Sequence, residues 1–219
     1  MSMTQDQVTE CRQCGTCCKN GGPALHFEDT VLLQSGGIPL TSLIALRKGE
    51  LAHNPVAGRV QPLSVELVKL RGVGRSWHCL YYSEVRGCTI YAHRPHACRT
   101  LKCWDTGEIL RLVETRALDR ITILGKDHQM VPLIREHEAN CPYGLLADLY
   151  AGKDRLDKGD KKKLEELVRY DLGFRNRVVR ENNIDLSLEL FYFGRPLFQL
   201  LQPLGVRTVE AAGSLFLRW

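Results

Sequence analysis

The chain has 219 residues, of which 44% are hydrophobic and 25% are charged, so it is long and apolar enough to bury an ordinary core. The first residues, Met1 to Gln7, are polar and lack the apolar core of a secretory signal. No stretch reaches the roughly 18 uninterrupted apolar residues that a membrane span needs. We therefore expect a cytoplasmic protein with no membrane partner, in which cysteines stay reduced.

The net charge of +5 is concentrated in one segment of the chain. Residues 153–180 contain ten Lys and Arg against six Asp and Glu. A local excess of this size is typical of a solvated helix face, and it disfavours nucleic acid as a partner. The same segment, 153–180, is a candidate docking surface for another protein.

Short elements separated by Gly and Pro make up the first third of the chain. Residues 26–34, with two acidic residues in the first turn, predict a short helix. Residues 39–53 predict a second helix that opens on a proline. Residues 63–70 alternate partly between apolar and polar, and residues 77–83 are rich in aromatics, so we expect these two runs to pair as a hairpin.

Cys79 and Cys88 flank a turn in which Gly87 directly precedes the second thiol. An extended arm, a glycine turn and a returning thiol commonly build a metal knuckle, because glycine lets backbone amides approach the sulfur closely. The turn therefore predicts a metal-binding loop.

A helix that carries Cys98 is expected to begin at Pro95, because a proline suits the first turn of a helix. Cys103 would lie about 140° farther round an ideal helix. Both thiols can face one metal only if the helix ends between them, and we predict that it does.

The second half of the chain is leucine-rich and predicts mainly helices. Residues 161–182 have the clearest amphipathic period in the chain, and Arg175 falls on the apolar face. Residues 184–201 are apolar but are interrupted at residues 194–196. The other expected helices are 106–118, 130–138 and 141–152.

Together these patterns predict an α+β fold that is mainly α. Residues 1–104 form an irregular, cysteine-rich metal-binding core with a short hairpin. Residues 105–219 form a helical extension that packs on this core as one domain.

Nine cysteines carry the chemistry of the sequence. Eight fall into two groups of four, and each group matches the four ligands of a tetrahedral zinc site or of a 4Fe–4S cluster. A disulfide framework is the alternative, but nothing in the sequence indicates export. The candidate metal ligands are Cys11, Cys14, Cys17, Cys18, Cys79, Cys88, Cys98, Cys103 and Cys141.

The adjacent pair Cys17 and Cys18 differs from the other cysteines, because neighbouring side chains diverge. Such a pair either binds two metal centres, or supplies one metal ligand and a second thiol that lies beside the metal without binding it. We therefore predict that the first group, Cys11 to Cys18, forms half of a metal site and that the second group, Cys79 to Cys103, forms the other half. For Cys141 two interpretations stay open, a ninth ligand or a buried free thiol.

At this point the sequence resembles the CxxCxxCC zinc- or iron-chelating domain family, also called YkgJ-like cysteine-cluster proteins. The resemblance covers about residues 11–103, and the Cys141-Pro142 dipeptide partly echoes a Cys-Pro-Gly segment of some relatives. The matching residues are Cys11, Cys14, Gly15, Cys17 and Cys18 in the first block, and Cys79, Cys88, Ile90, Tyr91, Arg94, Pro95, Cys98, Arg99 and Cys103 in the second. The resemblance implies binding of zinc or iron.

Three residues near the second block are candidates for supporting a thiolate centre. Arg94 and Arg99 could neutralise the negative charge of several thiolates on one metal, although surface ion pairs are an equal alternative. Tyr91 belongs to an aromatic group that we expect to shield the site from water.

The leading hypothesis is therefore a cytoplasmic metal-binding protein that holds iron, as an iron–sulfur cluster, or zinc. Flagellin lysine N-methylases share the cysteine pattern, which implies a protein-modifying enzyme that uses S-adenosylmethionine as one alternative. Residues 72–74 (Gly-Val-Gly) lack the third glycine and the following helix of a dinucleotide-binding loop. A zinc-stabilised interaction scaffold is the other alternative.

Overall fold

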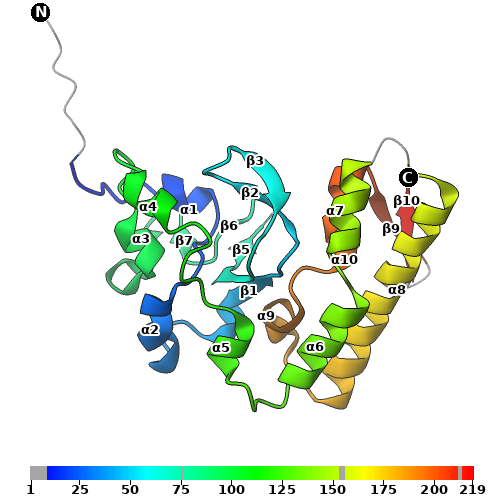
Figure 1. Cartoon of the computed structure of the whole chain (residues 1–219). Helices are drawn as coiled ribbons and strands as arrows, with labels where there is room; N and C mark the ends of the chain where they lie inside the picture. The colour runs from blue at the N-terminus through cyan, green and yellow to red at the C-terminus, as the bar shows by residue number, and fades with distance from the viewer. Residues whose placement is uncertain (1–8, 75, 153–155, 212–213) are drawn as a thin grey trace, which may run out of the picture.

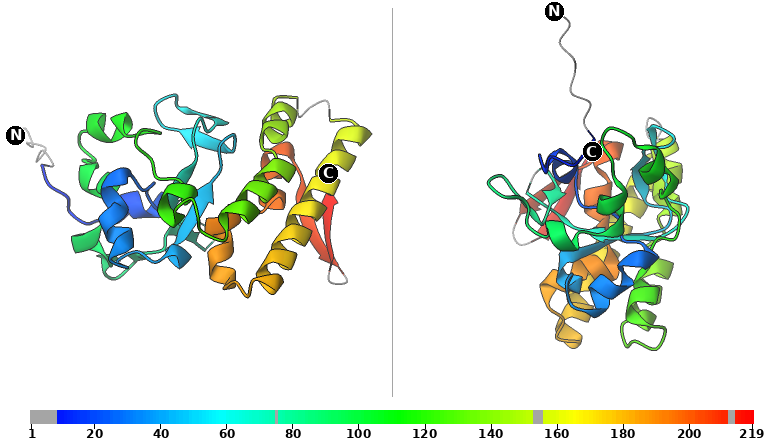
Figure 2. Two further views of the ribbon diagram at one scale, coloured as in Figure 1. Left: turned by 60° about the horizontal axis from the view of Figure 1, so that its bottom comes forward. Right: turned by 90° about the vertical axis from the view of Figure 1, so that its left-hand side faces the viewer.

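A computed structural model describes residues 9–74, 76–152, 156–211 and 214–219. Short helices and hairpins of the first half lie on one side of the molecule, and the longer helices of the second half lie on the other (Figures 1 and 2). The first three residues of the predicted basic segment, 153–155, lie outside the described residues.

The described strands pair as antiparallel two-stranded sheets. They are β1 (Leu43–Leu46) with β4 (Leu67–Leu70), β2 (Leu51–Asn54) with β3 (Arg59–Pro62), β5 (Gly72–Val73) with β6 (His78–Cys79), β7 (Tyr82–Ser83) with β8 (Gly87–Cys88), and β9 (Arg207–Ala211) with β10 (Ser214–Arg218).

Helices outweigh strands, and the mixed α+β class predicted from the sequence is confirmed. The α-helices are α1 (Thr16–Lys19), α2 (Thr30–Gln34), α3 (His96–Thr100), α4 (Gly107–Arg111), α5 (Arg120–Leu124), α6 (Val131–Asn140), α7 (Gly144–Ala151), α8 (Lys158–Glu181), α9 (Glu189–Phe193) and α10 (Leu197–Leu200).

The helix predicted over residues 39–53 is wrong. Only a 3-10 turn, Leu40–Ser42, follows the proline, and the chain then forms β1 and β2. The first three residues of β1 are fully buried, and the strand lies between β4 and α9. A short apolar run of this kind fits a doubly covered strand as well as a helix, so its period alone could not decide.

The predicted hairpin between residues 63–70 and 77–83 is also wrong. β4 pairs with β1, which offers it an apolar partner, and β6 pairs with the Gly72–Val73 strand instead. Residues 72–74 therefore enter a hairpin and do not form a phosphate-binding loop.

Of the helix predicted over residues 106–118, the structure forms only α4. Residues 115–118 leave the helical path because their backbone bonds elsewhere: Leu118 donates to Leu25 O at 3.0 Å and accepts from Val68 N at 3.1 Å. Tertiary hydrogen bonds thus replace the last turns of the helix.

The long helix predicted over residues 161–182 is confirmed as α8, which begins three residues earlier. Asp157 caps it by accepting a hydrogen bond from Asp160 N at 2.8 Å. The interruption near Gly194 separates α9 from α10, as predicted. The β9–β10 hairpin was not predicted; it lies beside α8, where Lys161 sits over the Trp219 ring at 5.4 Å (Figures 1 and 2).

One apolar core draws on both halves of the chain. Leu25, Leu43 and Val68 from the first half pack in one cluster with Phe174 and Phe193 from the second. A second cluster, which includes Cys141, Leu164 and Leu197, lies within the helical half. The proposed division at residues 104 and 105 stays a prediction.

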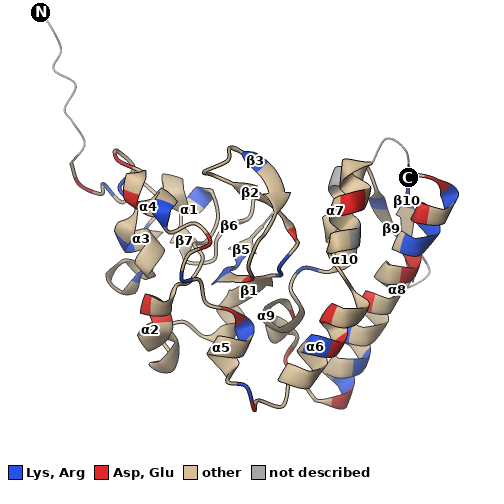
Figure 3. Ribbon diagram, in the orientation of Figure 1, with Lys and Arg blue, Asp and Glu red and all other residues tan. Residues whose placement is uncertain are grey.

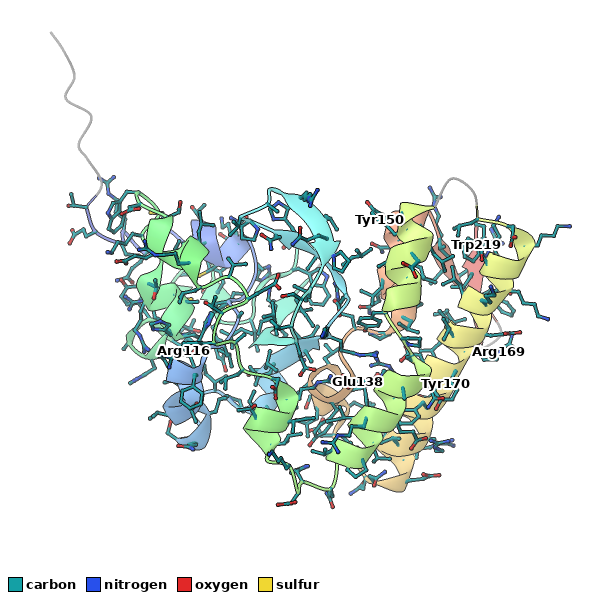
Figure 4. All side chains as sticks on the ribbon, in the orientation of Figure 1. Arg116, Glu138, Tyr150, Arg169, Tyr170 and Trp219 are labelled. Atoms are coloured by element: carbon teal, nitrogen blue, oxygen red, sulfur yellow. The ribbon has the colours of Figure 1, made fainter. Side chains whose placement is uncertain are left out.

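Buried charges join the elements around this core. Arg120 bonds Glu66 from the first half, and it donates to Tyr192 O and to Glu138. Glu138 lies near the middle of the molecule (Figure 4). Its position explains how one carboxylate of α6 can also approach Arg47 at 3.8 Å.

Basic residues recur along α8 (Figure 3), and most of them are exposed. Several are paired with acids, as in Arg177 with Glu136 at 3.0 Å and Lys162 with Glu166 at 3.9 Å. A role for this face in docking a protein stays a prediction. In the described part of the chain, no helix combines the length and apolarity needed to cross a membrane.

Arg175, on the apolar face of α8, is buried and caps the end of α9. Its guanidinium donates to Asp171 Oδ1 at 2.7 Å, to Glu189 Oε1 at 3.0 Å and to the carbonyl oxygens of Phe193 and Gly194 at 3.0 Å. These carbonyls are the ones that a helix end leaves without partners.

Replacing Arg175 by Met should lower the free energy of unfolding by about 3–5 kcal/mol, because Asp171 would stay buried with a lost partner. The matched variant Arg177→Met breaks an exposed ion pair on the same helix and should cost no more than about 0.5 kcal/mol. Urea unfolding of both variants measures the difference. Equal losses would show that Arg175 does not hold α8 and α9 together.

Candidate metal centre

Five cysteines from both sequence blocks line one cavity of about 610 Å³. Cys17 and Cys18 lie on α1, which packs against β6, the strand that carries Cys79. Cys88 ends β8 and Cys98 lies in α3. The structure therefore brings together two blocks that lie sixty or more residues apart in the sequence.

The local structure of the second block agrees with the sequence analysis. Residues 84–86 form the turn between β7 and β8, Gly87 opens β8 with a φ of +66°, and α3 ends at Thr100, before Cys103. The turn before Cys88 and the helix end between Cys98 and Cys103 are confirmed, and the role of this turn as a metal knuckle stays a prediction.

The remaining predicted ligands of the N-terminal block lie at the border of this region. Cys11 and Cys14 are exposed, but a Cβ on Gly87 would lie 3.0 Å from Gln13 O, so their loop lies against the β7–β8 turn. The Cys11 thiol is hydrogen-bonded to Tyr91, one of the aromatic residues expected to shield the site, and this bond raises the pKa of Tyr91. Cys11 and Cys14 thus lie near the cavity without lining it.

Cys103 and Cys141 are not brought to the cavity. Cys103 is exposed after α3. Cys141 is fully buried in the second apolar cluster, where burial raises the pKa of its thiol to about 12. The charged groups that act on this thiol are Asp171, Arg47 and Arg175, which belong to the helical half and its contact with β1.

Three of the cavity thiols resist ionisation. Burial, with a smaller contribution from the neighbouring Cys17, raises the pKa of Cys98 to about 12. Burial also raises the pKa of Cys79 and, together with Cys17, that of Cys18. The physical cause is shared: thiolates here would be desolvated and would repel one another.

Arg94, one of the two arginines predicted to neutralise thiolate charge, lines the cavity. It stacks on the Tyr91 ring at 3.9 Å and donates to Tyr91 O at 2.8 Å, and its charge opposes in part the rise in the pKa of the Cys98 thiol that burial causes. Arg99 donates to Arg94 O at 3.3 Å. Neither arginine makes an ion pair with a carboxylate of the described residues, which disfavours the surface ion pairs considered as an alternative.

Asp29 positions the site and was not singled out from the sequence. Its buried carboxylate accepts from His96 N at 2.7 Å through Oδ1 and from His26 N at 2.9 Å through Oδ2. These bonds attach the start of α3, and with it Cys98, to the chain at residue 26. In the sequence Asp29 has only the pattern of a helix-dipole acid, because its partner lies 67 residues away.

A second group of potential ligands lies in the helical half. His137, Cys141 and Asp171 are buried, and their ligand atoms lie within 4.8 Å of one another. Asp171 Oδ1, however, already accepts from His137 Nε2 at 2.6 Å and from Arg175, and Oδ2 accepts from Leu197 N at 2.8 Å. With its carboxylate fully used and two buried arginines nearby, this group is a structural network and a poor cation site.

Burial in this network also fixes the protonation of His137. The pKa of the imidazole is lowered to about 4, because burial and the nearby Arg175 and Arg47 disfavour the cation more than Asp171 favours it. Arg47 Nη1 faces Nδ1 at 3.5 Å, a geometry that suits a neutral ring with an accepting Nδ1.

The free energy of unfolding should fall by about 2 kcal/mol between pH 7 and pH 5. The unfolded imidazole takes up a proton near its ordinary pKa of about 6.5, whereas the folded one does so only near 4, so acid favours the unfolded state. Urea titrations at several pH values measure this slope. His137→Gln keeps a donor for Asp171 and should flatten the slope; a slope that is unchanged in this variant would contradict the assignment.

Gly15 sets the entry of the chain into α1. Its φ is +77°, and a Cβ at this position would lie 2.3 Å from Cε2 of Tyr82. Tyr82 lies in β7, beside the knuckle turn, and its hydroxyl donates to Glu84 Oε2 at 2.9 Å. The glycine of the Cys-Gly-x-Cys-Cys block is therefore required both by backbone conformation and by close packing against the second block.

Gly15→Ala should lower the melting temperature and the amount of bound metal, because it combines a strained φ with a ring clash. Gly58→Ala is the matched control: its φ is +64°, but nothing lies within 4 Å of the added Cβ. Strain at φ alone costs about 1–3 kcal/mol. Equal effects of the two variants on melting and metal content would show that packing against Tyr82 is unimportant.

Comparison with known proteins supports the assignment of the cysteine region. No curated protein and no solved structure matches the chain. The family model CxxCxxCC, described as a putative zinc- or iron-chelating domain, matches residues 10–122, which is more than half of the 219 residues and includes every cavity thiol. The chain belongs to the CxxCxxCC family.

Proposed function

We propose that this chain binds iron as an iron–sulfur cluster at the thiol-lined cavity. The carrying observation is that Cys17, Cys18, Cys79, Cys88 and Cys98 all line one cavity. That is one thiol more than the four that a tetrahedral zinc ion or a 4Fe–4S cluster takes, so the cavity supplies enough ligands for either centre. The exposed Cys11 and Cys14 are further candidate ligands, because their loop borders the same region.

The spacing of the thiols supports a cluster over a single zinc ion. Tetrahedral Zn–S bonds of about 2.3 Å require sulfur atoms roughly 3.8 Å apart. Within the described residues, the only trio of ligand atoms that all lie within 4.8 Å of one another is the one formed by His137, Cys141 and Asp171. No three cavity thiols of the described residues lie this close together, although the Cys17 and Cys18 thiols are hydrogen-bonded to each other, and such a wider set suits a centre of several atoms.

Metal binding would also relieve the electrostatic cost of the cavity. A thiol must lose its proton to become a ligand, and burial opposes this loss at Cys79 and Cys98. A cationic centre supplies the missing counter-charge, and Arg94 supports it from the rim. Binding should therefore release protons and weaken as the pH falls.

All nine cysteines are free thiols in this structure, which suits a reducing compartment. We therefore propose a cytoplasmic location.

Anaerobically purified protein should contain iron and sulfide and should absorb visible light through thiolate-to-iron charge transfer. Cys17→Ala and Cys98→Ala should each lose most of the iron and the visible band, because each removes a cavity thiol. Elemental analysis and absorption spectra measure both quantities.

Cys141→Ala is the control, since its thiol lies in the other apolar cluster and should leave iron content unchanged. A colourless protein that contains one zinc ion for each chain would overturn the iron proposal and leave thiolate chelation standing. Loss of iron in Cys141→Ala alone would overturn the location of the site.

A further inference from the structure

Lys69 is a charged residue in an unusual place. It lies in β4, which pairs with β1 on one side, where Lys69 faces Ile44, and forms a bridge to Ala24 on the other. Because side chains alternate along a strand, Leu67 and Lys69 point away from the core that holds Val68 and Leu70. Both Leu67 and Lys69 line the thiol cavity.

The charges of Cys79, Glu50 and Arg195 act on the amine of Lys69 without forming a pair with it. No hydrogen bond or ion pair to Nζ is formed within the described residues, and the amine lies close to Gly21, where an added Cβ would be 3.9 Å away. Burial lowers the pKa of this amine. A half-buried ammonium that forms no ion pair carries a desolvation cost that a bound anion would offset.

Other polar groups of the cavity are already engaged. Glu114 accepts from Asn54 Nδ2 at 3.3 Å and from Ser64 N at 3.0 Å, and Arg94 is bonded to Tyr91 O. His26 Nδ1 lies 3.0 Å from Thr115 O. Apart from the thiols and the exposed side chains of Asn20 and His53, Lys69 is the polar group of the cavity that remains available for a ligand.

The rest of the cavity wall is largely apolar. It includes Leu46, Leu63, Leu67, Ile109, Leu112 and Val113, which come from β1, β4, α4 and the segments beside them. A cavity of about 610 Å³ lies in the range that holds a small organic ligand. An apolar wall with one unpaired cation selects a molecule with an apolar body and a single negative charge.

We propose that this cavity binds a small organic monoanion, such as a medium-chain carboxylate, with its charged group on Lys69 and its apolar chain against the leucine-rich wall. This site lies beside the thiols, and its ligand contacts need no metal. The inference therefore goes beyond metal binding and can fail independently of it.

Calorimetric titration of the purified, metal-loaded protein with hexanoate, octanoate and decanoate tests the proposal. Affinity should rise about four-fold for each added methylene, because each buries more apolar surface. Octan-1-ol, which has the same chain without the charge, should bind at least about ten-fold more weakly than octanoate. Equal binding of the alcohol and the carboxylate, or no binding of any probe, would overturn the proposal.

Variants of the cavity separate the two contacts. Lys69→Met should weaken octanoate binding about ten-fold or more and leave octan-1-ol unaffected, whereas Lys69→Arg should retain octanoate. Val113→Trp fills the cavity and should abolish binding of both probes, while Val31→Trp, on the exposed face of α2, should leave both unchanged.

Metal analysis of the same samples keeps the two proposals apart. Lys69→Met should retain the metal content of the original chain. If this variant loses its metal together with octanoate binding, Lys69 serves the thiolate centre and the ligand proposal is overturned. If the original chain holds no metal but binds octanoate through Lys69, the proposed metal centre fails and the ligand site stands.

Discussion

The crowding of thiols around one cavity is the constraint on which the rest of this structure depends. Five thiols share a partly buried space, and burial together with neighbouring sulfurs raises the pKa of three of them, Cys18, Cys79 and Cys98. A fold gains nothing in stability from such an arrangement by itself. The surrounding elements must therefore hold the cysteines together at a cost, and a metal that replaces the protons would recover it.

Several local features of the backbone hold the two cysteine blocks together at the cavity. Gly15 and Gly87 adopt positive φ where the two blocks touch, at the Tyr82 ring and at Gln13 O. Asp29 ties the start of α3 to the chain at residue 26 through two hydrogen bonds to backbone amides. Each feature acts on the backbone beside a cysteine and leaves the thiol itself free, which is what a ligand site requires.

How far the sequence predicts this structure depends on whether the signal is local. The turn before Cys88, the end of α3 before Cys103 and the long helix α8 all follow from neighbouring residues, and all are confirmed. The strand β1 could not be predicted, because its apolar run owes its conformation to β4 and α9. Asp29 and Lys69 were missed for the same reason: their meaning depends on residues far along the chain.

The contrast between two buried polar groups shows how a structural network differs from a binding site. Around Asp171 each carboxylate oxygen is used, since His137 and Arg175 share one and Leu197 N occupies the other. Closing such a network fixes α6, α8 and α10 in place, and a new ligand would have to break it.

At the thiol cavity the opposite holds. Cys79, Cys98 and Lys69 line the same space, and no carboxylate of the described residues forms an ion pair with the Lys69 amine. Polar groups that are left unpaired in a half-buried space raise the free energy of the empty site. His137, Cys141 and Asp171 have the spacing of a metal site, but their hydrogen bonds make them a structural network. The more widely spaced groups of the thiol cavity are therefore the ones that are arranged to bind a ligand.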